Sequence, residues 1–482
     1  MVKSKDYDLI VGLEVHVQLQ TQSKLFCGCC TSFGAQPNTQ TCPVCTGMPG
    51  ALPVLNRRAL QLAIRTGLAL NCDIATFTKW DRKNYFYPDL PKGYQISQFA
   101  TPVVGKGEIT LDLENGNQRI VGITRAHLEE DAGKSVHDLF PGQTGIDLNR
   151  TGTPLLEVVS EPDLRSASEA AEYFRQVHGL VKYLGICDGN LAEGSMRCDA
   201  NVSVRPSGQN EFGERTEIKN INSFRFVERA IELEIERQID VLEAGGTIYR
   251  ETRLFDADAD ETRTMRSKEL SEDYRYFPDP DLLPLQISEA FVQTVRDNLP
   301  ELPDARCERY QQTLGLSAYD AASLSSDLER AEFFEAVVDV CGNPKLSANW
   351  LNGELSAHLN NADLEIATCP VSAKQLGQLI QRIDDETLSS KTAKELFKAL
   401  WAQADAESAV DELIEQLGLK QMNDDGELTA VVTSVLEANP DQVAELRSGK
   451  DKVLGFLVGQ VMKATGGKAN PKQVNEMIRK NL

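Results

Sequence analysis

The hydrophobic periodicity of the chain changes near residue 290, and this change restricts the fold more than any other feature. Before it, short segments carry apolar residues at every second position between turns rich in Gly, Pro and Asn, as at 8–20 and 198–205. Such alternation is typical of β-strands, whereas the spacing after residue 290 is typical of helices. The sequence therefore predicts an α+β fold, in which an N-terminal block with an antiparallel sheet precedes two all-α domains.

The length of 482 residues suits three domains. We place the first at 1–290, because the Pro-rich segment 276–284 ends the strand-rich block. A helical domain at 291–410 and a C-terminal tail domain at 411–482 follow.

The net charge of -22 argues against a protein that binds nucleic acid over its whole surface, because phosphate neutralisation requires a basic surface. The tail is the exception, since the segment from Arg447 to Lys480 contains eight basic residues and only two acidic ones, Asp451 and Glu476. No apolar stretch reaches the roughly 20 residues of a membrane span, and the N-terminus lacks the apolar region of a signal peptide. We therefore expect a cytoplasmic protein with a local basic patch.

Two strand segments carry polar residues that share one face. Successive side chains of a strand point to opposite sides, so Glu14 and His16 lie together in the first strand and Asp199 lies with Arg205 in another. Carboxylate and imidazole groups so placed can converge on a divalent cation. A solvated sheet face would show the same pattern, so the residues alone leave both interpretations open.

A third acidic segment contains Glu129, Glu130 and Asp131 and continues into Gly133-Lys134-Ser135. Three acids at a strand end beside Gly-Lys-Ser suggest a metal site next to a phosphate-binding turn, although a charged turn is an equal alternative. The segment is not a P-loop, because Leu128 stands where that motif requires its first glycine.

The loop at 78–98 combines the cations Lys79, Arg82 and Lys83 with several aromatic residues. Cations of this kind can hold a triphosphate, and aromatic rings can stack on a base. The alternative is a packed irregular loop with surface lysines.

The cysteines of the segment 27–45 form two short chelating turns. Cys27 and Cys29 precede Cys42 and Cys45 at a spacing that suits tetrahedral Zn²⁺ with four thiolates, and Cys30 could replace Cys29. Four thiolates leave no position for water, so such a zinc ion would be structural. Free thiols are the alternative.

Eight strings in order along the chain resemble one protein family, the B subunits of the aspartyl/glutamyl-tRNA(Asn/Gln) amidotransferase. They include GLEVHVQL (12–19), DRKNYFYPD (81–89), HLEEDAGKS (127–135) and RCDAN (197–201). The others are YQISQ (94–98), DLNRTGTPLLE (147–157), DYRYFPDPD (273–281) and GFLVGQVMK (455–463), so the resemblance covers essentially the whole chain.

This resemblance implies an ATP-dependent ligase, a glutamine-dependent carbon–nitrogen amidotransferase. Its N-terminal domain would be a cradle related to glutamine synthetase that uses Mg-ATP to phosphorylate the side-chain carboxylate of Glu-tRNA(Gln), Asp-tRNA(Asn) or both. Ammonia from an amidase A subunit would then displace the phosphate, and a small C subunit would complete a heterotrimer. The sequence does not decide between Glu and Asp. The rival interpretation is a non-catalytic tRNA-binding module on a zinc-stabilised platform.

The family pattern assigns four magnesium ligands, and the remaining site residues are our own inference. The implied magnesium ligands are Glu14, His16, Glu130 and Asp199, with Glu129 close by. The candidate phosphate ligands are Lys79, Arg82, Lys83 and Arg205, and the candidate tRNA contacts of the tail are Lys452, Lys463, Lys468 and Lys472.

Overall fold

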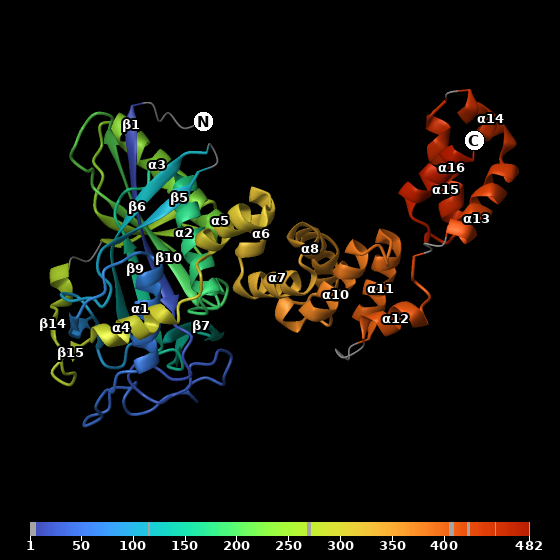
Figure 1. Ribbon diagram of the computed structural model, residues 1–482. Coiled ribbons are helices and arrows are strands. Elements are labelled where there is room, and N and C mark those ends of the chain that lie inside the picture. Colours follow the sequence, from blue (N-terminus) through green and yellow to red (C-terminus); the bar gives the residue numbers. More distant parts are fainter. Residues whose placement is uncertain are drawn as a thin grey trace. The chain divides into compact units, whose positions relative to one another are not determined.

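The computed structural model describes residues 6–113, 116–267, 271–403, 409–421, 425–448 and 450–481 (Figure 1). The chain forms two compact units, Met1–Leu302 and Pro303–Leu482. Their boundary lies later than the predicted residue 290, because helix α4 (Glu289–Asp297) packs on helix α1 (Arg57–Ala69) of the first unit. Arg65 of α1 donates a hydrogen bond of 2.8 Å to the carbonyl oxygen of Asn298 just beyond α4.

An eight-stranded sheet forms the centre of the first unit, in the order β13-β12-β11-β10-β1-β9-β6-β5. Its strands are β1 (Tyr7–Gln18), β5 (Gly107–Asp112), β6 (Gln118–Glu130), β9 (Pro154–Ser160), β10 (Met196–Pro206), β11 (Thr216–Lys219), β12 (Glu251–Asp256) and β13 (Glu261–Ser267). Neighbouring strands are antiparallel except β11 and β12. That pair is parallel because helix α3 (Phe224–Glu243) connects its strands as a crossover.

Helix α2 (Ala167–Tyr183) and α3 cover one face of this sheet. The alternate side chains Val11, Leu13, Val15 and Val17 of β1 are at most 1% exposed and form the core on that face. Alternation then directs the polar residues of β1 to the opposite face. The predicted strand face of Glu14 and His16 is therefore available for chemistry.

Smaller pairings attach the loops of the first unit to the sheet. Strand β3 (Asp81–Asn84) pairs with β4 (Tyr94–Ser97) and β14 (Phe277–Pro278), while β2 (Phe77–Thr78) pairs with β15 (Leu285–Gln286). Strands β7 (Lys134–Phe140) and β8 (Gln143–Asp147) form a hairpin. The predicted loop at 78–98 is thus partly strand, and it packs against the segment around residues 274–279.

The described residues of the second unit form helices and no strand. These are α5 (Pro303–Leu314), α6 (Ala318–Ser325), α7 (Leu328–Cys341), α8 (Pro344–Trp350), a π-helical turn (Leu351–Leu355), α9 (Ser356–Ala362), a 3₁₀ turn (Ile366–Thr368), α10 (Ala373–Asp384), α11 (Ser390–Ala402), α12 (Val410–Gln416), α13 (Asp425–Ala438), α14 (Pro440–Arg447), α15 (Lys452–Ala464) and α16 (Pro471–Lys480). Side chains such as Ser317, Asp327 and Ser372 accept hydrogen bonds from the first turns, which fixes where these helices begin. Apolar spacing also predicts a helix at 406–417, and its first residues, 406–408, lie outside the described residues.

Two separate hydrophobic cores hold these helices together. One contains 24 buried side chains between Tyr310 and Leu419, and the other contains ten between Leu428 and Ile478. No described helix is long and apolar enough to cross a membrane.

Candidate metal and phosphate site

The strand register brings polar residues of four strands onto one face of the sheet. Glu14 of β1 lies opposite Asp199 of β10, and His16 lies opposite Arg197. On the other side of β1, His16 lies opposite Glu157 of β9, which in turn lies opposite His127 of β6. Directly opposed side chains on one face are neighbours, so the pairing alone builds a continuous polar surface.

A first group of carboxylates consists of Glu14, Asp199 and Glu217. One oxygen of each lies within 4.8 Å of the others. Asn201 donates a hydrogen bond of 2.8 Å to Glu14, and the ammonium group of Lys219 lies 2.6 Å from Asp199 and 3.4 Å from Glu217. Clustered carboxylate oxygens are the ligands that Mg²⁺ prefers, so this group could hold one such ion.

A second group consists of His16, Glu129 and Glu157, whose ligand atoms also lie within 4.8 Å of one another. His16 Nε2 lies 3.4 Å from Glu157, and His127 Nε2 lies 3.5 Å from Glu157 and 3.7 Å from Glu129. Burial opposes a charged Glu157, but His127 and His16 outweigh it and hold the pKa of Glu157 well below its usual value. Burial likewise opposes a charged His16, but its hydrogen bond to Glu157 and the negative charges of Glu157 and Asp199 together outweigh burial and raise the pKa of His16.

A pocket of about 420 Å³ opens beside both groups, and three cations line it: Lys83, Arg197 and Lys219. Lys83 Nζ lies 5.1 Å from the centre of the Tyr274 ring. Burial opposes its charge, but Glu129 and other neighbours outweigh burial and raise the pKa of Lys83 well above its usual value. Arg197 lies 3.0 Å from Asp131, so its guanidinium is held in place at the pocket wall. The pocket thus combines carboxylates that could bind a metal ion with cationic side chains that could bind an anion such as phosphate.

The structure separates Glu130 from the other predicted magnesium ligands. Glu14 and Asp199 belong to the first group and His16 to the second, whereas Glu130 belongs to neither group within the described residues. Side chains alternate along β6, so Glu129 shares a face with His127 and Glu130 points to the other face. There Glu130 forms an ion pair with Lys92 and accepts a hydrogen bond of 3.1 Å from the backbone of Ile96. A metal-binding role for all four residues stays a prediction.

Of the predicted phosphate ligands, Lys83 lines the pocket. Arg82 is instead bound by Asp279 at 2.8 Å and Asp281 at 3.0 Å, and it lies over the ring of Tyr94. Arg205 lies 3.4 Å from Asp8 near the far end of β10, six residues along the strand from Asp199. Lys79 lies beside Trp80 before β3 and is not among the residues that line this pocket.

Four residues of this site were not predicted from the sequence: Glu157, Arg197, Glu217 and Lys219. A signal for some of them was present, because Arg197 is two positions before Asp199 and Glu217 is two positions before Lys219. Period-two spacing places such pairs on one face. Which strands lie next to each other could not be derived from that spacing.

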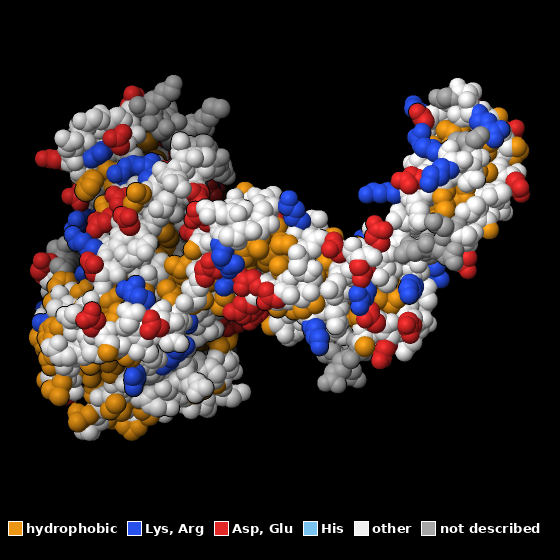
Figure 2. All heavy atoms as spheres, viewed as in Figure 1, with side chains coloured by type: hydrophobic (Ala, Val, Ile, Leu, Met, Phe, Trp, Pro, Cys, Tyr) orange, Lys and Arg blue, Asp and Glu red, His pale blue; other side chains and the backbone are white. Residues whose placement is uncertain are grey.

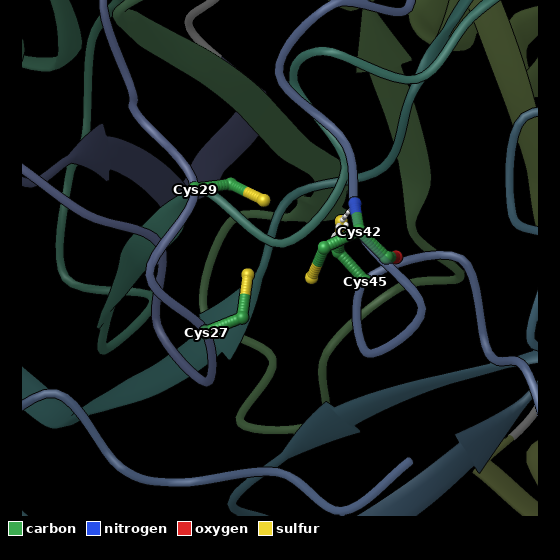
Figure 3. A group of neighbouring side chains, drawn as sticks. All are labelled: Cys27, Cys29, Cys42 and Cys45. Carbon is green, nitrogen blue, oxygen red and sulfur yellow. Dashed lines mark hydrogen bonds between the residues drawn. The ribbon is translucent and has the colours of Figure 1, made fainter.

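The four predicted cysteines converge in the loop at 27–45. The sulfur atoms of Cys27, Cys29, Cys42 and Cys45 lie within 4.8 Å of one another, and Figure 3 shows them pointing to a common centre. Cys30 is exposed and its sulfur lies 3.2 Å from the hydroxyl of Ser32, so the geometry selects Cys29 over Cys30.

A buried lysine adjoins this cluster. The side chain of Lys24 is fully buried, and its ammonium group lies 3.6 Å from the sulfur of Cys45. The hydrogen bond with Cys27 and the charge of Lys24 lower the pKa of Cys45. Four converging sulfur atoms with a buried cation beside one of them fit a zinc ion held by thiolates.

The C-terminal helices expose most of the predicted tRNA-binding lysines. Leu454, Leu457 and Val461 of α15 are buried in the last core, which leaves Lys452, Lys463 and Lys472 exposed and Lys468 half-buried. Figure 2 shows Lys and Arg side chains on the visible face of these helices. Binding of RNA by these lysines stays a prediction.

The chain thus combines a mixed α/β unit, with two acidic groups on one face of its sheet, and a helical second unit. Residues 9–293 match the family model of the GatB/GatE catalytic domain, and residues 332–482 match that of the GatB domain. The chain belongs to the family of B subunits of the aspartyl/glutamyl-tRNA(Asn/Gln) amidotransferase, as its motifs predicted.

Curated relatives of that name match the chain from end to end. The protein from Thioalkalivibrio sulfidiphilus is 58% identical over 478 residues, which are 99% of this chain and 100% of the relative. The proteins from Alkalilimnicola ehrlichii and Pseudomonas syringae pv. tomato are 57% and 56% identical, and each match covers 99% of both chains.

Proposed function

We propose that this chain uses Mg-ATP to phosphorylate the side-chain carboxylate of Glu-tRNA(Gln), Asp-tRNA(Asn) or both, so that ammonia can convert it to the amide. The relatives' name supports a role on these tRNAs. The main observation in support of this chemistry is that two groups of potential metal ligands and three cationic side chains lie at one pocket.

The reaction explains why such a pocket is needed. A carboxylate is a poor acyl donor, because oxide is a poor leaving group. In the first step a carboxylate oxygen attacks the γ-phosphorus of ATP, and ADP leaves. In the second step the nitrogen of ammonia attacks the carbonyl carbon, phosphate leaves and the nitrogen loses a proton. The first step gathers anionic oxygens in one place and therefore requires cations.

The residues around the pocket can meet this requirement in two ways, by holding a metal ion and by binding phosphate directly. Magnesium, when bound, neutralises phosphate charge, and Glu14, Asp199 and Glu217 would hold one ion while His16, Glu129 and Glu157 would hold a second. Lys83, Arg197 and Lys219 can then bind phosphate oxygens that are not on a metal. Of the predicted phosphate ligands, Lys83 therefore has the strongest support.

Zinc and the partner subunits complete the proposed function. Cys27, Cys29, Cys42 and Cys45 fit a structural Zn²⁺ site of four thiolates. By family resemblance the N-terminal unit is a cradle related to glutamine synthetase. An A subunit supplies ammonia from glutamine, a C subunit completes a heterotrimer, and the complex works in the cytoplasm. The exposed lysines of α15 and α16 support a role of the tail in binding tRNA.

The rival function is a tRNA-binding module without catalysis. Such a module has no need for two groups of potential metal ligands, each with its ligand atoms within 4.8 Å of one another, beside a pocket lined by cations. The two acidic groups therefore favour the ligase.

The test uses the heterotrimer with glutamine, Mg-ATP and Glu-tRNA(Gln), and it measures ADP and Gln-tRNA. We expect Asp199→Ala to abolish both products while hydrolysis of glutamine by the A subunit continues. Asp112→Ala is a matched control, because Asp112 lies in edge strand β5 and binds Gln118. A wild-type complex that formed no ADP in the presence of its substrates would refute the proposed function.

A further inference from the structure

Arg125 lies on the polar face of the sheet, at the side opposite Lys219. It pairs in register with Val159 of β9, which pairs with Glu14 of β1. Strands lie about 4.8 Å apart, so the backbones of Arg125 and Glu14 are about 10 Å apart across the sheet. The side chain of Arg125 therefore starts about 10 Å from the backbone of Glu14 on the same face, and it belongs to neither acidic group.

The guanidinium of Arg125 differs from those of Arg82 and Arg197 in lacking an acidic partner. Its Nε is buried and has no hydrogen-bond partner. Within the described part of the chain no ion pair is formed by Arg125, whereas Arg197 is paired with Asp131 and Arg82 with Asp279. A buried donor without an acceptor is costly and calls for an explanation, such as a ligand that supplies the acceptor.

A pair of aromatic rings lies beside this guanidinium. The guanidinium lies 6.0 Å from the centre of the Phe99 ring, which stacks on Tyr276 at 4.2 Å with an angle of 14° between the rings. Burial raises the pKa of Tyr276, while the positive charges of Lys83 and Arg125 act in the opposite direction. Both cations thus lie near Tyr276, beside the second acidic group.

We propose that Arg125 binds phosphate oxygens of the metal-bound nucleotide. The guanidinium presents several donors in a planar fork that matches two oxygens of a phosphate. Acidic groups on the same face would hold the metal, while Arg125 and Lys83 bind oxygens that point away from it. This inference rests on the proposed function, because it requires ATP as the phosphate source.

The test compares Arg125→Met and Arg125→Lys with the wild-type heterotrimer. The probe is a non-hydrolysable ATP analogue with Mg²⁺, and its Kd is measured by titration calorimetry without tRNA. Loss of hydrogen bonds to a charged ligand is expected to weaken binding about ten- to a hundredfold in Arg125→Met. Arg125→Lys keeps the positive charge but loses the planar guanidinium, so its Kd should lie between those of the wild type and Arg125→Met. This variant also provides the test if Arg125→Met does not fold.

Arg119→Met is the matched control. Arg119 lies on the same strand but pairs with Glu169 of α2, so its loss should leave the Kd of the analogue unchanged. An unchanged Kd of the analogue in both Arg125 variants would overturn the assignment. If the variants weakened binding of tRNA but not of the analogue, the phosphate bound by Arg125 would belong to the RNA backbone, and the assignment would be overturned as well. A wild-type complex that does not bind the analogue would instead refute the proposed function itself.

Discussion

The ammonium group of Lys219 lies 2.6 Å from a carboxylate oxygen of Asp199, across the neighbouring strands β11 and β10. Burial opposes the charge of Lys219, but Asp199 and Glu217 outweigh burial and raise its pKa. Lys219 therefore remains charged and reduces the repulsion among Glu14, Asp199 and Glu217. This balance keeps three carboxylates close enough to receive a divalent cation.

Replacing Asp199 tests that group directly. Asp199→Asn keeps the shape but removes the charge, so we expect the Mg²⁺ concentration for half-maximal amidation to rise by at least about tenfold. The measurement is a magnesium titration of the heterotrimer at saturating ATP and tRNA. An unchanged titration curve would show that Asp199 does not bind the ion, and Asp112→Asn serves as the control.

Glu129 and Glu130 are adjacent but are expected to behave differently. Glu129→Gln removes a carboxylate beside His16 and Glu157, so the requirement for Mg²⁺ should increase. Glu130→Gln removes the partner of Lys92, so it should lower the thermal stability or the rate without changing the magnesium titration. The reverse result would support the assignment of Glu130 as a magnesium ligand.

The cysteine cluster predicts that the purified protein contains zinc. Cys45→Ser removes one of the four sulfur atoms of the group, and we expect the zinc content to fall from about one ion per chain to near zero, with a lower Tm. Elemental analysis and thermal unfolding are the two measurements. Cys30→Ser should change neither value, because Cys30 lies outside the cluster. Wild-type protein that contains no zinc after purification would contradict the prediction.

The tail lysines should contribute to tRNA affinity through charge. Replacing Lys452, Lys463 and Lys472 together by Gln should weaken binding of the tRNA and reduce the slope of log K against log salt by about 0.7–0.9 for each lost phosphate contact. Hydrolysis of glutamine by the A subunit should not change. Equal affinity and an equal salt slope would show that RNA does not contact these lysines.

His178 predicts a pH dependence of stability. Burial lowers the pKa of His178 in α2 below its ordinary value of 6.5, although its hydrogen bond to the carbonyl of Gly189 acts in the opposite direction. As pH falls below 6.5 the unfolded state therefore takes up the proton first, and the free energy of unfolding decreases. His178→Gln should reduce that decrease, which chemical denaturation between pH 7 and pH 5 can measure. An identical pH profile in the variant would contradict this role.

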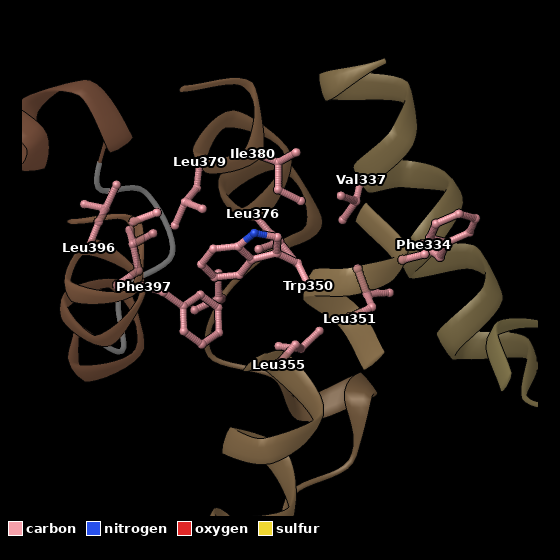
Figure 4. Close-up of a cluster of buried hydrophobic side chains, with 14 of the residues drawn as sticks. Phe334, Val337, Trp350, Leu351, Leu355, Leu376, Leu379, Ile380, Leu396 and Phe397 are labelled. Atoms are coloured by element: carbon pink, nitrogen blue, oxygen red, sulfur yellow. The ribbon is translucent and has the colours of Figure 1, made fainter. Parts of the chain in front are cut away.

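Local signals in the sequence specify where several helices of the second unit begin. Apolar spacing and N-caps such as Ser372 and Asn470 give nearly the observed starts of α10 and α16, because helical hydrogen bonds and caps lie within a few residues. The buried side chains of the larger core, including Trp350, Leu376 and Phe397, belong to those helices (Figure 4). The apolar face of β1 is also specified locally, because successive side chains of a strand alternate between its two faces.

The sequence by itself also determined the family and the position of the cysteine cluster, because both depend on short contiguous strings. Only the tertiary structure places Cys29, and not Cys30, with the other three cysteines. The sequence did not determine the membership of the metal groups. Glu157, Glu217 and Lys219 join Glu14 and His16 through the strand order β11-β10-β1-β9, which is set by pairings between residues far apart in the chain. The direction of a side chain at a strand end is decided in the same way. Glu129 and Glu130 are chemically alike, and only the face of β6 that each occupies places one beside His16 and the other beside Lys92.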